Sequence, residues 1–107
     1  MAKEMNKPVP ALEFADSYLQ NLRASAESFR KGEDYNGLDM LLKGLENFER
    51  MLCMGDFDIN SAEMNSIVRE YRNLLIYMHN RDSIGVTDIL EYTLYPLSEK
   101  WLKGVGQ

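Results

Sequence analysis

Residues 56–60, with the sequence DFDIN, begin like a calcium-binding loop because carboxylate and amide oxygens alternate along them. Such a loop needs a glycine at its sixth position for a sharp turn, and a glutamate at its twelfth position to hold the ion with two oxygens. Here Ser61 and Ile67 stand at those positions. The segment therefore predicts an ordinary loop before a helix, and no metal site.

His79 and Cys53 are the single residues of their types, and neither has the neighbours that chemistry requires. A di-iron centre in a helical bundle needs Glu-x-x-His pairs, but residue 76 is isoleucine. His79 matches no phosphorelay motif and is interpreted as a capping or surface residue. Cys53 has no histidine within sequence reach to activate it. We therefore expect no catalytic residue, no cofactor and no metal, and a protein that is not an enzyme.

The composition is typical of one globular domain. The 107 residues are 45% hydrophobic and 27% charged, which suffices for a single core without a disulfide or a metal. The net charge is −5 and lysine and arginine form no run, so we expect no nucleic-acid partner. No apolar stretch approaches the ~20 residues of a membrane span, and the N-terminus lacks the apolar core of a signal peptide. These features predict a cytoplasmic protein that does not bind a membrane.

Four stretches repeat apolar residues at spacings of three and four, which is typical of helices with one apolar face. They predict a first helix over 11–31, a second over 37–52, a third from residue 61 and a fourth with its apolar face between 90 and 101. The others are expected to pack along the second helix, whose apolar face is formed by Leu38, Leu41, Leu45, Phe48 and Leu52. The face of the first helix is formed by Leu12, Ala15, Leu19, Leu22, Ala26 and Phe29.

Short polar residues predict where these helices start. Asp34 is expected to cap the second helix, and Asn60, with Glu63 three residues on, has the capping-box spacing for the third. Three residues are candidates for the cap of the fourth helix: Asp82, Ser83 and Thr87.

Four helices with short connections predict an all-α fold, an antiparallel up-down-up-down four-helix bundle. The alternative is a three-helix core with the fourth helix packed across it or swapped onto a second chain. Pro96 should kink the last helix near residue 95, because proline cannot donate the helical hydrogen bond. The expected organisation is an N-terminal arm (1–9), a single bundle domain (10–104) and a tail (105–107).

Two sets of apolar residues lie off these faces and are candidate partner-binding surfaces. The first is a stripe on the second helix, Met40, Gly44 and Met51, in which glycine permits close approach and methionine adapts to varied partners. The second lies opposite the apolar face of the fourth helix and comprises Tyr92, Tyr95 and Leu102. Phe14 and Tyr18 likewise lie off the face of the first helix. The alternative for each set is a wide apolar face that touches two neighbouring helices.

Two segments, 29–52 and 88–101, resemble segments of small helical proteins of Gram-positive bacteria that have no assigned activity. The resemblance implies a helical fold and a bacterial cytosolic protein, and it implies no reaction. In architecture the chain is also similar to flagellar export chaperones, small acidic bundles that hold a helix of a secreted partner.

These features favour a non-enzymatic helical protein–protein interaction module. It would be an adaptor or an export-chaperone-like bundle that binds a partner helix, with another protein or a second copy of itself, as a homodimer, as the partner. The alternative is a small-molecule-binding or regulatory helical domain. The first predicts a large exposed apolar patch, and the second predicts a polar-lined pocket within the bundle.

Overall fold

The computed structural model describes residues 9–54, 57 and 59–105. Of these residues 89% are helical and none is in a strand, which confirms the all-α class. The predicted arm and tail lie almost wholly outside the described residues, as do Asp56 and Asp58 of the calcium-like loop. The elements are α1 (Val9–Arg30), α2 (Asp34–Met54), α3 (Ala62–His79), α4 (Ser83–Asp88), the π-helical segment η1 (Ile89–Leu94) and α5 (Tyr95–Val105).

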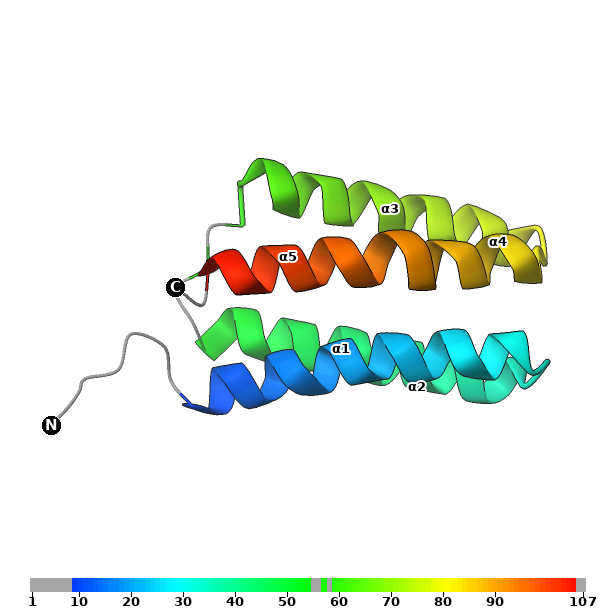
Figure 1. Cartoon of the computed structure of the whole chain (residues 1–107), viewed down its shortest axis with the longest axis horizontal. Helices are drawn as coiled ribbons and strands as arrows, with labels where there is room; N and C mark the ends of the chain where they lie inside the picture. Colours follow the sequence, from blue (N-terminus) through cyan, green and yellow to red (C-terminus); the bar gives the residue numbers. More distant parts are fainter. Residues whose placement is uncertain (1–8, 55–56, 58, 106–107) are drawn as a thin grey trace, which may run out of the picture.

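Because α4, η1 and α5 follow one another without a gap, the elements make four helical rods. Figure 1 shows these rods lying along the long axis of the molecule, with the chain running back in the opposite direction after each connection. The molecule measures 50 × 25 × 19 Å. The predicted kink at Pro96 stays a prediction, but the last rod is irregular, since η1 ends two residues before this proline.

The caps of α2 and α3 differ from the sequence prediction. Ser61, and not Asn60, caps α3, and its side chain accepts a hydrogen bond of 3.1 Å from the backbone N–H of Met64. Helix α2 already begins at Asp34, which places this carboxylate in the first turn and not before it. Of the three candidates for the fourth helix, Asp82 is the cap of α4 and accepts from the backbone N–H of Gly85.

The helix around which the others pack is α1, and the prediction that gave this place to the second helix was wrong. Helix α1 lies against α2 on one side and against α4, η1 and α5 on the other. Helix α3 packs on α4, η1 and α5. In contrast, no Cα atom of α2 lies within 8 Å of a Cα atom of α3, α4, η1 or α5. The backbones of α2 and α3 are therefore further apart than those of the other neighbouring rods, and we call the side of the molecule between them the open side.

Small residues bring α1 and α2 together. A Cβ atom added to Gly37 would lie only 2.7 Å from the Phe29 ring, so this ring lies directly on the backbone of α2. The buried Ser25 hydroxyl donates a hydrogen bond of 2.6 Å to the Gly37 carbonyl. The close approach depends on glycine at this position.

A buried group of hydroxyls links α1, α3 and α5. The Tyr18 hydroxyl lies 2.8 Å from the Tyr71 hydroxyl and 2.8 Å from Ser98 Oγ. Tyr18 and Ser98 are fully buried, so Tyr18 belongs to the core although it lies off the predicted face of its helix. Removal from water raises the pKa of both tyrosines, because it disfavours the charged phenolate.

Candidate functional site

The predicted stripe on α2 packs against α1. Met51 is fully buried, and Gly44 is buried with an added Cβ atom only 3.1 Å from Asn21 Cβ. Met40 is half-buried, and its sulfur accepts from Asn21 Nδ2 at 4.0 Å. The placement of Gly44 and Met51 on an exposed surface was therefore wrong. Their small and flexible side chains serve the close contact of the two helices.

The three residues predicted on the outer side of the fourth helix do not share one exposed surface. The Tyr92 side chain is 71% exposed. Tyr95 is half-buried, its hydroxyl accepts a hydrogen bond of 2.9 Å from Arg23, and its ring lies 4.6 Å from the Arg23 guanidinium. Leu102 is half-buried and packs against the core. Whether these residues bind a partner stays a prediction.

Only one edge of the apolar face of α2, together with the adjacent Leu42, is partly uncovered, whereas Leu41 in the same face is buried. Leu38, Leu42 and Leu45 are 37%, 55% and 36% exposed. At about 100° per residue these three leucines lie within about 60° of one another around the helix. The close backbone contact of α2 is with α1, and these three leucines form a partly exposed row, which we call the α2 row.

Helix α3 carries a second apolar row. Its Tyr77 ring packs on α4, because a Cβ atom added to Gly85 would lie 2.6 Å from this ring. Val68 and Leu75 lie about 180° and 160° around α3 from Tyr77, and so point away from α4. They are 43% and 62% exposed. We call Val68 and Leu75 the α3 row.

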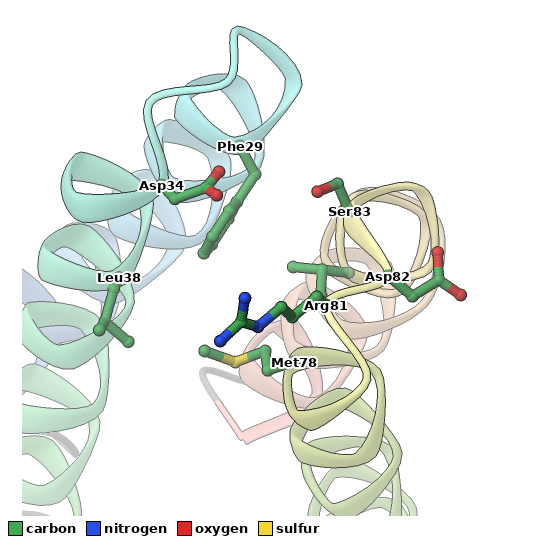
Figure 2. A pocket seen from close by; sticks show the side chains of 8 residues that line it. Phe29, Asp34, Leu38, Met78, Arg81, Asp82 and Ser83 are labelled. Carbon is green, nitrogen blue, oxygen red and sulfur yellow. The ribbon is translucent and has the colours of Figure 1, made fainter.

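A cavity of about 380 Å³ lies at one end of the open side, where the turn after α1 approaches the turn after α3 (Figure 2). Leu38 of α2 and Met78 of α3 both line it, so these two helices form its opposite walls. Phe29 and Val86 add apolar surface, and Asp34 and Arg81 add charge. A cavity of this size falls in the range of small-ligand sites, roughly 300–1,000 Å³.

Arg81 is the charged group that enters this cavity. Figure 2 shows its guanidinium pointing into the space between α2 and α3, next to Met78. Within the described part of the chain its side chain makes no hydrogen bond or ion pair. Asp82, the next residue, points away from the cavity in Figure 2 and caps α4. The cavity thus combines an apolar lining with one guanidinium that has no protein partner among the described residues.

A second cavity, of about 330 Å³, lies between α1 and the last rod and is lined by charged residues that pair with one another. Arg30 pairs with Glu27 at 3.1 Å and with Glu91 of η1. Because Arg30 and Glu91 are already paired with each other, this cavity has fewer charged groups free to bind a ligand than the first cavity has. Among the described residues, no three histidine, cysteine, aspartate or glutamate side chains gather as a metal site.

A family model described as a domain of unknown function, DUF8042, matches residues 11–104. The chain belongs to this family. No curated protein and no solved structure matches the chain. Among the described residues of this DUF8042 domain, no helix combines the length and the apolar character that crossing a bilayer requires.

Sequence reasoning about this DUF8042 domain missed Arg81 and the cavity. The segment 79–83, HNRDS, was interpreted only as the polar end of a helix. Within it no glycine is available to end the helix in the left-handed conformation, and this absence was the signal that another residue must adopt it. The exposure of the α2 row could not be read from its spacing, which is the same for a covered and an uncovered face.

Proposed function

We propose that this protein is a non-enzymatic interaction module, an antiparallel up-down-up-down four-helix bundle that binds an amphipathic helix of a partner protein in the groove between α2 and α3. The observation that carries the proposal is the pair of uncovered apolar rows on these two helices. An amphipathic helix in an apolar groove is a recurrent mode of protein recognition. An adaptor or an export-chaperone-like role fits this mode.

Two further features support the cellular location and the kinked last rod that we propose. The resemblance of segments 29–52 and 88–101 to small helical proteins of Gram-positive bacteria supports a bacterial protein of the cytoplasm. The π-helical segment η1, which ends two residues before Pro96, supports a kink in the last rod, since such segments and proline both bend helices.

The test is the double substitution Leu42→Glu and Leu75→Glu, one in each row. Both side chains are more than half exposed, so the free energy of unfolding should change by about 0.5 kcal/mol or less per site. Partner capture should be lost, because a carboxylate in an apolar groove must give up its hydration when the partner binds. Proteins retained by the wild type and lost from this variant are identified by mass spectrometry.

The matched control is Tyr92→Ser, which alters an exposed apolar residue outside the groove. It should retain the same partners. Loss of capture by Tyr92→Ser together with retention by the groove variant would place the interface on the last rod and refute the groove. Light scattering of both variants distinguishes a second copy from a foreign partner, since a homodimer through the groove would dissociate in the double variant.

A second candidate function is the binding of a small molecule. The observation that favours it is the Arg81 cavity, which joins a charge to an apolar lining.

A further inference from the structure

Helices α1 and α3 end in the same backbone motif but use different residues in it. At the end of α1, Gly32 has φ of 80° and the backbone N–H of Glu33 donates to the carbonyl of Ser28. At the end of α3, Arg81 has φ of 57° and the N–H of Asp82 donates to the carbonyl of Tyr77. Both are Schellman motifs, whose left-handed position is usually glycine because a Cβ atom is disfavoured there.

Arg81 therefore occupies a position at which helix termination alone would favour glycine. The presence of arginine there calls for an explanation other than helix termination. A residue held in a disfavoured backbone conformation is a pointer to function where a second observation supports it. Here the second observation is the cavity, since the guanidinium points into it and has no partner among the described residues (Figure 2). The left-handed backbone directs this side chain into the space between the two walls.

The chemistry of the cavity defines its ligand. A guanidinium offers a planar pair of N–H donors that matches the two oxygens of a carboxylate. Beside it Leu38, Met78, Phe29 and Val86 offer apolar surface, which matches a hydrocarbon chain. Asp34 and Asp82 also line the cavity. The Asp82 carboxylate points away from it in Figure 2, so Asp34 is the carboxylate that opposes an anion there. We propose that this cavity binds a free carboxylic acid with a short apolar chain, with the carboxylate on Arg81 and the chain on the apolar lining.

The inference goes beyond the proposed partner binding, and it is tested with octanoate as the probe. Octanoate is titrated into the isotope-labelled protein at neutral pH, and the backbone amide signals of Gly85 and Val86 are followed by NMR. The wild type should show a saturable shift of these signals. Octanol, which has the same chain without the charge, should shift them only weakly.

Arg81→Gly is the decisive variant, because glycine suits the left-handed position and should leave the melting temperature unchanged or higher. Its affinity for octanoate should fall about tenfold or more, since a charged hydrogen-bond pair is lost. Arg81→Gln keeps the Cβ atom without the charge and should lose affinity in the same way. Asp34→Asn should bind octanoate more tightly than the wild type, because it removes the like charge.

Three results would overturn the proposal: no saturable shift in the wild type, equal binding of octanol and octanoate, or full affinity in both Arg81 variants. The double variant Leu42→Glu and Leu75→Glu separates this proposal from partner binding. It should bind octanoate like the wild type while it loses the partner, so a failure of either function is visible without the other.

Discussion

The contact between Phe29 and Gly37 shows how one missing side chain shapes the molecule. Because glycine has no Cβ atom, the Phe29 ring lies on the backbone of α2 and there forms part of the cavity lining. The same ring is buried in the core. Gly37 therefore sets both the distance between α1 and α2 and the shape of the cavity.

Gly37→Ala should destabilise the protein although alanine is the better helix former. The added methyl group would overlap the buried ring, and such overpacking costs about 1–3 kcal/mol, against about 1 kcal/mol gained from helix propensity. Urea denaturation measures the net loss. Gly104→Ala is the matched control, because no atom lies within 4 Å of its added Cβ, and it should be neutral or stabilising. A Gly37 variant as stable as the control would contradict the close contact.

The buried tyrosines make the stability depend on pH at alkaline values. Because burial raises the pKa of Tyr18 and Tyr71, the folded state favours their neutral forms. Their contribution is complete below the ordinary tyrosine pKa of about 10 and is lost as the pH rises above it, at up to about 1.4 kcal/mol per pH unit for each group. Unfolding free energies measured between pH 8 and 11, roughly spanning that ordinary value, should show this decline.

Tyr71→Phe removes one of the two phenols, so its decline above pH 10 should be shallower than that of the wild type, by about one proton in slope. Tyr92→Phe removes an exposed phenol and should leave the decline unchanged. Identical pH profiles for the wild type and Tyr71→Phe would show that Tyr71 is not buried in the folded state.

At the scale of the elements, Tyr92 and Tyr95 show that neighbours on one rod differ in role. Tyr92→Ser should change the unfolding free energy by no more than about 0.5 kcal/mol, because this side chain is 71% exposed. Tyr95→Ser should cost more, about 1–3 kcal/mol, since it removes a half-buried ring and the hydrogen bond from Arg23. Denaturant unfolding of the two single variants measures the difference. Equal costs would contradict the placement of Tyr95 against α1.

The helices could be predicted from the sequence because a spacing of three and four reports a helix with an apolar side. That spacing does not say what covers this side. Leu38 and Leu45 were assigned to the core, yet more than a third of each is exposed, because the close neighbour of α2 lies on its glycine side. Contacts made by small residues carry little hydrophobic signal, so periodicity overlooks them.

The buried hydroxyl group around Tyr18 and the Arg81 cavity could not be predicted from apolar spacing either, for a different reason. Tyr18 was assigned off the core face, but its hydroxyl finds two partners on rods far along the chain, which no local pattern reveals. Arg81 enters the cavity through one left-handed backbone angle. Both depend on which turns and rods meet in space, and this is set by tertiary packing.

At the scale of the whole molecule, the rods follow one another in space in the order α2, α1, the last rod and α3. Two of them, α1 and the last rod, have close neighbours on two sides. The outer two, α2 and α3, each have close backbone contact with one rod and reach a second rod through side chains, Phe48 to Trp101 and Tyr71 to Tyr18. The molecule thus has an inner pair and an outer pair of helical rods.

This arrangement predicts that the protein does not open as a single cooperative unit. Detachment of α2 breaks its contact with α1 and the contact of the Phe48 and Trp101 rings, which lie 5.8 Å apart. Exposure of α1 requires the loss of its neighbours on both sides, so native-state hydrogen exchange should assign α2 a lower opening free energy than α1. Exchange measured in low concentrations of denaturant should show the amides of α2 becoming labelled before those of α1. Simultaneous exchange of both helices would contradict the open order of rods. A helix bound between α2 and α3 would slow hydrogen exchange in these two outer rods, so the least protected amides of the free protein would report on partner binding.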